Sequence, residues 1–249
     1  MDSAPACGGF LRWCDEVGVE RASVRVQQRP GRGRCLVSSG PRRRGDRLTA
    51  VPRSAIISEG MRCGEYDASH WMLGLVHRLL EEDALGPSSR YAPFVELLFD
   101  SGEPTDLASF AELPGCAGRR ARYLAAERAR VVAELCEAQP ACAPDRAARA
   151  LHAVDTRSVY SKRLAVRALV PFFDFMNHDA DPSAEWSMDE DGGVSVEARR
   201  DVAAGEEVTI FYDDIPNARM LLTYGFLPDG AGPRRSMELM VDVDDGALG

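Results

Sequence analysis

The alternation of hydrophobic and polar positions predicts short strands in the first part of the chain. Apolar and polar side chains alternate over residues 22–28, which is the period of a half-buried strand. The turn sequence Arg-Pro-Gly follows at 29–31, and residues 34–38 form a second short apolar run, so the two runs predict a hairpin. A third strand is expected over residues 46–51, because Pro52 interrupts strand pairing directly after it.

The middle of the chain has the spacing and composition of helices. Residues 70–82 carry an apolar stripe at helical spacing, and Ser69 is a suitable N-cap for that helix. Residues 117–138 are rich in Ala, Arg, Glu and Leu, which are strong helix formers. After a proline-containing break, residues 145–160 are predicted to form another helix.

The last part of the chain returns to strand patterns. Residues 168–172 are a short apolar run, and residues 194–198 alternate after the hairpin-type turn Asp-Gly-Gly. Further strands are predicted over residues 206–212 and 237–243. Strands on both sides of a helical stretch favour an α+β fold, in which two sequence-distant halves form one β-rich domain with helices inserted between them.

Composition argues against several functional classes. The 249-residue chain has a formal net charge of −9, which argues against nucleic acid or an anionic membrane as its partner. No apolar run approaches the roughly 20 residues of a membrane span, and the first ten residues resemble neither a signal peptide nor a transit peptide. The seven cysteines have no zinc-ligand spacing, so we expect reduced thiols in an intracellular protein without a metal site. Lys162 is the only lysine, and hence the one candidate lysine for self-modification.

Four ordered motifs occupy the second half of the chain, downstream of Arg157. The sequence LVPFFDFMNH spans residues 169–178, and GEEVTIFY spans residues 205–212. An Asn-Ala pair follows at 217–218, and then LLTYGF at 221–226. Each motif alone is ordinary, because Asn and His are common in turns, Tyr in strands and Gly at helix C-termini.

In combination, these motifs resemble the SET-domain methyltransferases of the class that contains the Rubisco large-subunit lysine methyltransferase and the actin-histidine methyltransferase. The N-terminal half is similar to the same class through Gly-x-Gly at 31–33, Gly-Asp at 45–46, Val-Pro at 51–52 and Tyr-Ala-Pro-Phe at 91–94. The resemblance covers most of the chain. It implies a SET-type, β-rich fold of small sheets with a helical insert.

The same resemblance implies a division of the chain into four parts. Residues 1–68 would be the N-terminal half of the SET domain, and residues 69–160 the helical insert. Residues 161–228 would be the C-terminal half with the cofactor site. Residues 229–249 would begin a truncated C-terminal region that binds substrate.

The resemblance also implies the activity: a monomeric enzyme that transfers a methyl group from S-adenosyl-L-methionine to a side-chain nitrogen of a protein substrate. Tyr212 is the expected catalytic tyrosine. The residues expected to bind the cofactor are Gly33, Arg34, Arg157, Asp174, Asn177, His178, Asn217 and Phe226. Those expected to line the substrate channel are Phe173, Phe211 and Tyr224. A dry aromatic channel lowers the pKa of a lysine amine from its reference value of about 10.4, which favours the nucleophilic neutral form.

A lysine acceptor on a non-histone protein is favoured over a histidine acceptor. The histidine enzyme of this class differs at the positions of Val159, Phe173 and Tyr224, and the last two resemble the lysine enzymes more closely. Two alternatives stay open: a protein-histidine N-methyltransferase, and a catalytically silent SET-fold module that binds other proteins. The silent module is motivated by Asp213, which stands where the class usually has glycine, and where a positive φ would strain an aspartate.

Overall fold

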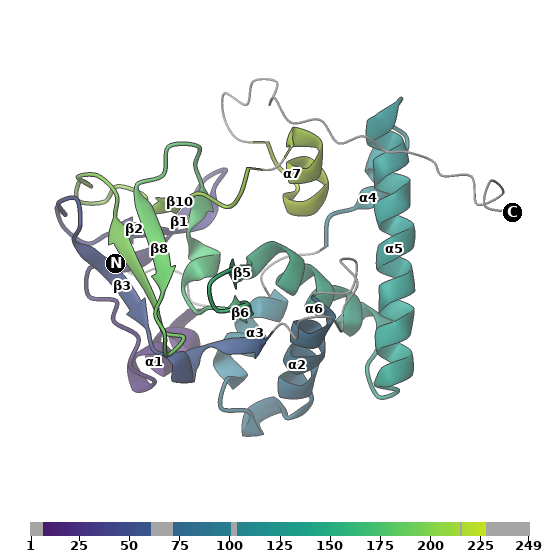
Figure 1. Ribbon diagram of the computed structural model, residues 1–249, viewed down its shortest axis with the longest axis horizontal. Helices are drawn as coiled ribbons and strands as arrows, with labels where there is room; N and C mark the ends of the chain where they lie inside the picture. Colours follow the sequence, from purple (N-terminus) through teal and green to yellow (C-terminus); the bar gives the residue numbers. More distant parts are fainter. Residues whose placement is uncertain (1–6, 61–71, 101–103, 215, 228–249) are drawn as a thin grey trace, which may run out of the picture. The chain divides into compact units, whose positions relative to one another are not determined.

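The chain folds into two compact units. The computed structural model describes residues 7–60, 72–100, 104–214 and 216–227 (Figure 1). The first unit comprises Met1–Pro104 and Val132–Tyr212, and the second comprises Thr105–Val131 and Asp213–Gly249. The two units do not coincide with the four parts expected from the sequence, whose boundaries lie at residues 69, 161 and 229. Those four parts stay a prediction.

Within the described residues, small sheets form the β-structure of the first unit. The strands are β1 (Val24–Arg29), β2 (Gly33–Ser38), β3 (Arg47–Val51), β4 (Ile57–Gly60), β5 (Ser158–Ser161), β6 (Val166–Leu169), β7 (Asn177–His178), β8 (Ala184–Met188), β9 (Val194–Ala198) and β10 (Thr209–Ile210). β1 and β2 form the expected antiparallel hairpin, and β7 pairs with β10 in parallel. The other two sheets have the strand orders β3-β9-β8 and β4-β6-β5.

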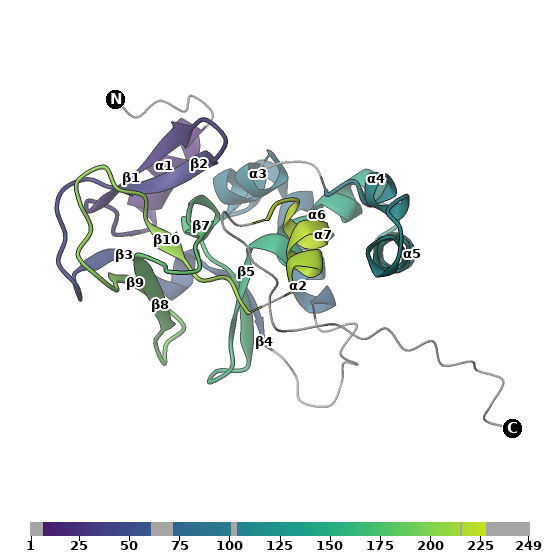
Figure 2. The same ribbon diagram turned by 90° about the horizontal axis from the view of Figure 1, so that it is seen from above.

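Strands from the two ends of the chain pair directly. Val51 in β3 lies opposite Val194 in β9, and Ile57 in β4 lies opposite Leu169 in β6. All four of these side chains are buried. The two sequence-distant halves therefore form one β-rich body, as the α+β expectation required (Figure 2).

The first unit also contains helices. Its long helices are α1 (Gly8–Glu16), α2 (Leu73–Ala84), α3 (Ala92–Asp100) and α6 (Pro144–Arg157). The periodic apolar positions of α2 are buried, with Leu75 and Leu79 each exposed by 1% or less. Full burial of such a side chain contributes about 2 kcal/mol relative to leaving it in water. α2 bears the core-facing stripe that the sequence predicted, and α6 also has a buried face.

Helix α1 was not predicted, and it supports the later part of the chain. The ring of Phe10 lies 5.9 Å from that of Phe172 and 5.8 Å from that of Phe175. The indole Nε1 of Trp13 donates a hydrogen bond of 2.8 Å to the carbonyl oxygen of Arg90. The first helix thus buries its apolar face against residues far along the chain.

Two predicted boundaries were wrong because tertiary pairing decides them. The helix expected to reach residue 160 ends at Arg157, since residues 158–161 pair with β6. The strand expected over residues 206–212 is regular only at Thr209–Ile210. Before that point Val208 donates its N–H to the carbonyl oxygen of Leu36, so this segment first crosses β2 and then turns to β7.

The second unit is helical. α4 (Leu107–Ala111) is N-capped by Asp106, whose carboxylate accepts from the N–H of Ala108 at 3.0 Å. The long helix α5 (Cys116–Ala138) begins in this unit, and α7 (Asn217–Tyr224) belongs to it. Leu222 of α7 packs with Leu107 and Ala121, which gives the unit a small core of its own.

Several expectations concern residues outside the described ranges. These are the start of the first insert helix at 69–71, the strand at 237–243 and the C-terminal region at 229–249. Among the described residues, no helix is both long and apolar enough to cross a membrane. Across the same residues, no group of three or more His, Cys, Asp or Glu side chains is placed to hold a metal ion.

Candidate active site

The two short strands β7 and β10 bring Asn177 and His178 next to the segment that leads to Tyr212. Thr209 lies opposite Asn177, and Ile210 lies opposite His178, in parallel register. The N–H of Asp179 donates to the carbonyl oxygen of Ile210, which extends this pairing. The Asn-His pair and the strand that leads to Tyr212 are thereby held side by side, although 30 residues separate them.

Tyr212 and His178 are joined by a hydrogen bond and by ring contact. The backbone N–H of Tyr212 donates to Nδ1 of His178 at 3.2 Å, and the two ring centroids are 5.4 Å apart. Because a backbone N–H only donates, Nδ1 is the acceptor, and the neutral imidazole carries its proton on Nε2. The hydroxyl of Tyr212 donates to the carbonyl oxygen of Met176 at 2.9 Å. Both ends of the tyrosine are therefore fixed by the segment that carries Asn177.

The two phenylalanines expected in the substrate channel have different surroundings. Phe211 is 41% exposed, and its ring centroid lies 5.5 Å from that of His178. Phe173 is only 4% exposed and packs edge-on against Trp186, with centroids 5.8 Å apart. Phe211 thus presents an aromatic surface to solvent beside the Asn-His pair. Phe173 is instead enclosed in the interior against Trp186.

A buried carboxylate that sequence reasoning missed lies next to Asn177. Oε1 of Glu207 accepts a hydrogen bond of 2.8 Å from Nδ2 of Asn177. Oε2 of the same carboxylate lies 3.5 Å from Nη1 of Arg29 and 3.4 Å from Nε of Arg32. The turn between β1 and β2 is therefore tied to the Asn-His pair by one glutamate. The signal available in the sequence was the second Glu of Gly-Glu-Glu, on the face of the strand opposite to Glu206.

The glycine turn leaves open space at its backbone. Gly33 has φ +67°, and a Cβ placed on it would meet no atom within 4 Å. Glycine adopts this conformation without the strain that a side chain would bring. The neighbouring Arg34 holds its guanidinium 5.5 Å above the ring of Phe175, in a cation–π arrangement. The turn therefore combines an accessible backbone with a fixed cation.

Arg157 and Asp174 form an ion pair in the interior. Nη1 of Arg157 lies 3.7 Å from Oδ2 of Asp174, whose side chain is 1% exposed. Neither carboxylate oxygen accepts a hydrogen bond from another described residue. Burial raises the pKa of Asp174 above its ordinary value, while Arg157 and Arg34 act in the opposite direction. An enclosed carboxylate with unused acceptor capacity suits a ligand that brings its own N–H donors.

The remaining expected residues, Asn217, Tyr224 and Phe226, lie in the second unit. Asn217 is the first residue of α7 and Tyr224 the last. Gly225 follows with φ +79° as the helix C-cap, as the Tyr-Gly-Phe sequence indicated. The rings of Tyr224 and Phe226 are 6.3 Å apart, and Phe226 is 39% exposed.

Asp213 is not strained. The described non-glycine residues with positive φ are Ala165 and Phe172, so Asp213 has an ordinary backbone conformation. Its carboxylate accepts a hydrogen bond of 2.8 Å from the N–H of Asp214. The aspartate at this position therefore does not distort the backbone next to Tyr212.

Comparison with known proteins identifies related chains. A family model described as "SET domain" matches residues 33–213. Over 79 residues the chain is 37% identical to SET domain-containing protein 8 of Schizosaccharomyces pombe, a stretch that covers 30% of this chain and 18% of that protein.

Solved structures share the fold over nearly the whole chain. The crystal structure of the SET domain of LSMT bound to lysine and AdoHcy is 21% identical, with a TM-score of 0.75, and the match covers 92% of this chain and 58% of that one. Rubisco LSMT bound to AdoMet is 23% identical, with a TM-score of 0.70, over 92% of this chain and 57% of that one. At these identities the likeness establishes the fold. The chain spans less than two thirds of the length of each of these relatives.

Proposed function

Since this chain belongs to the SET-domain family, we propose that it is an S-adenosyl-L-methionine-dependent protein-lysine N-methyltransferase that acts on a non-histone protein. The observation that carries the proposal is the parallel pairing of β7 with β10. This pairing holds Asn177 and His178 next to the strand that leads to Tyr212. It assembles an amide, an imidazole and a phenol on one small surface.

The cofactor has a chemically suitable set of partners in the first unit. S-adenosyl-L-methionine supplies the methyl group as an electrophile on a sulfonium. The guanidinium of Arg157 suits its carboxylate, and the buried oxygens of Asp174 suit donors that no described residue provides. The open backbone of Gly33 admits close approach, and Asn177 and His178 offer their backbone and side chains.

Tyr212 would position the acceptor nitrogen. Its hydroxyl hydrogen is donated to the carbonyl oxygen of Met176, so toward a ligand the phenol oxygen acts as an acceptor of N–H or polarised C–H groups. Methyl transfer requires nitrogen, methyl carbon and sulfur in line, and alignment contributes several kcal/mol to lowering the barrier. A tyrosine that is fixed both at its backbone N–H and at its hydroxyl serves that alignment.

A lysine acceptor is supported by the exposed aromatic surface of Phe211 beside His178. An apolar entrance penalises the ammonium form and so favours the neutral amine. The solved relatives bound to lysine and to monomethyllysine support the same acceptor class. A histidine acceptor is the competing form of the proposal, and the chemical identity of the labelled residue separates the two.

The test is transfer of a labelled methyl group from the cofactor to proteins of a cell extract, followed by mass spectrometry of the labelled residue. Tyr212→Phe should lower turnover by about 100-fold, because it removes the hydroxyl that aligns the acceptor. Tyr123→Phe, at a 50% exposed position on α5, is the matched control and should leave turnover unchanged. Absence of both labelling and cofactor binding by calorimetry would instead favour the silent binding module.

A further inference from the structure

The negative net charge of the chain conceals a strongly basic segment. Residues 21–53 contain ten arginines and one acidic residue, Asp46, which gives this segment a formal charge of +9. Because the whole chain carries −9, the remaining residues carry −18. Clustered charge of one sign attracts partners of the opposite sign. The segment includes β1, β2 and β3.

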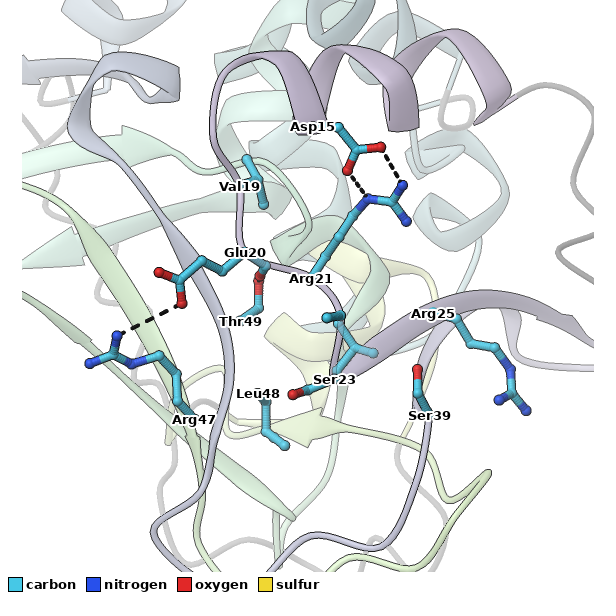
Figure 3. A pocket seen from close by; sticks show the side chains of 12 residues that line it. Asp15, Val19, Glu20, Arg21, Ser23, Arg25, Ser39, Arg47, Leu48 and Thr49 are labelled. Carbon is cyan, nitrogen blue, oxygen red and sulfur yellow. Dashed lines mark hydrogen bonds and ion pairs between the residues drawn. The ribbon is translucent and has the colours of Figure 1, made fainter.

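A cavity of about 710 Å³ is lined mostly by residues of this basic segment. Its lining includes none of the residues assigned above to methyl transfer. The lining residues are Asp15, Val19, Glu20, Arg21, Ala22, Ser23, Val24, Arg25, Ser39, Arg47, Leu48 and Thr49 (Figure 3). The cavity is therefore a separate feature of the first unit.

The three arginines of the cavity differ in how far they are neutralised. Arg21 donates twice to the carboxylate of Asp15, with both distances 2.7 Å. Arg47 lies 3.8 Å from Glu20, but both side chains are well exposed, so this pair contributes little. Arg25 takes part in no hydrogen bond or ion pair with a described residue, and Figure 3 shows it on the other side of Ser39 from Glu20 and Arg47.

Two hydroxyls accompany the unpaired guanidinium. The backbones of Ser39 and Ser23 are joined by a hydrogen bond of 2.9 Å, while neither hydroxyl is used by another described residue. The third hydroxyl of the lining differs, since Thr49 donates to the carbonyl oxygen of Glu20 at 2.7 Å. Figure 3 shows the hydroxyl of Ser23 on the other side of Ser39 from Arg25, so the guanidinium of Arg25 is itself the group whose paired N–H donors match a carboxylate.

We propose that this cavity docks an acidic segment of the protein substrate, with a carboxylate bound by Arg25. The identification of the partner as the substrate rests on the proposed methyltransferase function. An acidic peptide is favoured over nucleic acid because no aromatic side chain lines the cavity to stack a base.

Strand β1 connects the cavity to the candidate active site. Arg25 lies near its start, and Arg29 at its end donates to the carbonyl oxygen of Gly205 and pairs with Glu207. Four residues of strand span about 13 Å. A substrate segment that follows β1 would therefore place its acidic anchor several residues from the methylated side chain.

The test is a fluorescence titration of the full chain with a labelled twelve-residue peptide of alternating glutamate and serine. This peptide contains no methyl acceptor, and no cofactor is added. Arg25→Gln should raise the dissociation constant about tenfold, because a charge-assisted hydrogen bond is lost. Arg43→Gln, an exposed arginine of the same segment outside the lining, and Arg119→Gln, an exposed arginine on α5, should change it less than twofold.

Equal small effects of the three substitutions would show diffuse attraction without a site and would overturn the proposal. Tighter binding of a single-stranded oligonucleotide with the same dependence on Arg25 would also overturn it, in favour of nucleic acid. Thermal unfolding of each variant checks that the fold is kept. Since the titration measures neither cofactor binding nor methyl transfer, its failure is separate from failure of the methyltransferase assignment.

Discussion

Asn177 and Glu207 are joined by a hydrogen bond of 2.8 Å between the side-chain amide and a carboxylate that is 9% exposed. The same carboxylate balances Arg29 and Arg32 from the turn between β1 and β2. One residue thus orients the amide expected to contact the cofactor and also fixes the glycine turn. Loss of the Asn177–Glu207 hydrogen bond should therefore weaken cofactor binding more than it slows methyl transfer.

Glu207→Ala should weaken binding of S-adenosyl-L-methionine about tenfold and lower the free energy of unfolding by about 2 kcal/mol. The reason is that Asn177 and both arginines lose their buried partner. Glu207→Gln should have a smaller effect on binding, because its amide oxygen still accepts from Asn177. Calorimetric titration and thermal unfolding measure the two quantities, with the exposed Glu197→Gln as control. Equal effects of the Ala and Gln variants would contradict the orienting role.

Asp174 should make stability depend on pH in a defined direction. Its pKa is raised in the folded protein, chiefly by burial, above the ordinary value of 3.8. Ionisation of this carboxyl therefore costs stability, and the cost is absent below 3.8 and grows as the pH rises through the folded-state pKa. Asp174→Asn should gain stability relative to the native chain as the pH rises from about 4 to about 7.

The same Asp174→Asn variant should bind cofactor more weakly, since its amide offers a single acceptor oxygen and no charge. Urea unfolding at several pH values, with the exposed Asp181→Asn as control, measures the stability difference. A difference between variant and native chain that does not change with pH would refute the assigned cost of ionisation.

The buried cysteines should react slowly with thiol reagents. Burial raises the pKa of the Cys14 thiol and that of the Cys35 thiol, and both side chains are fully buried. A thiolate is the reactive species, so both residues should be labelled only after unfolding. Among the described cysteines, Cys136 and Cys142 are partly exposed and should be labelled before Cys14 and Cys35 in the folded protein. Mass spectrometry of peptides after timed alkylation gives the order, and early modification of Cys14 would contradict it.

Among the described residues, the two non-glycine positions with positive φ should respond to glycine in opposite ways. Ala165 is exposed with φ 50°, so Ala165→Gly should stabilise the protein by about 0.5 kcal/mol through relief of backbone strain. Phe172 has φ 74° but is fully buried, so Phe172→Gly should destabilise it by about 3 kcal/mol despite the same relief. Thermal unfolding measures both, and Ala204→Gly, at an exposed position without positive φ, should be mildly destabilising.

Local patterns were sufficient for the elements whose neighbours in sequence are also their neighbours in space. The β1–β2 hairpin follows from alternation on each side of an Arg-Pro-Gly turn, and β9 follows from alternation after Asp-Gly-Gly. α5 follows from helix propensity alone. In each case a short stretch of sequence is enough to predict the element.

Elements that depend on distant partners were missed or misplaced. α1 begins with two glycines, which are poor helix formers, and it is held by Phe94, Phe172 and Phe175 rather than by its own propensity. Residues 158–161 are strand because β6 pairs with them.

The residues of the candidate site likewise include some that the sequence predicted and one that it did not. The ordered motifs pointed to Asn177, His178 and Tyr212, which the β7–β10 pairing brings together. They did not point to Glu207, because a glutamate after a turn is usually solvated, and only the position of Arg29 and Arg32 in space makes it a buried partner. The binding and catalytic roles of all the expected site residues stay predictions.

The packing of Phe10 against Phe172 and Phe175 has a consequence for synthesis of the chain. The first helix leaves the ribosome before its partners, about 165 residues later, have been made. At roughly 5–20 residues per second, this leaves an apolar helix face uncovered for about 10–30 seconds. Newly made chains should therefore depend on chaperones during that interval, more than the modest size of the folded protein would indicate.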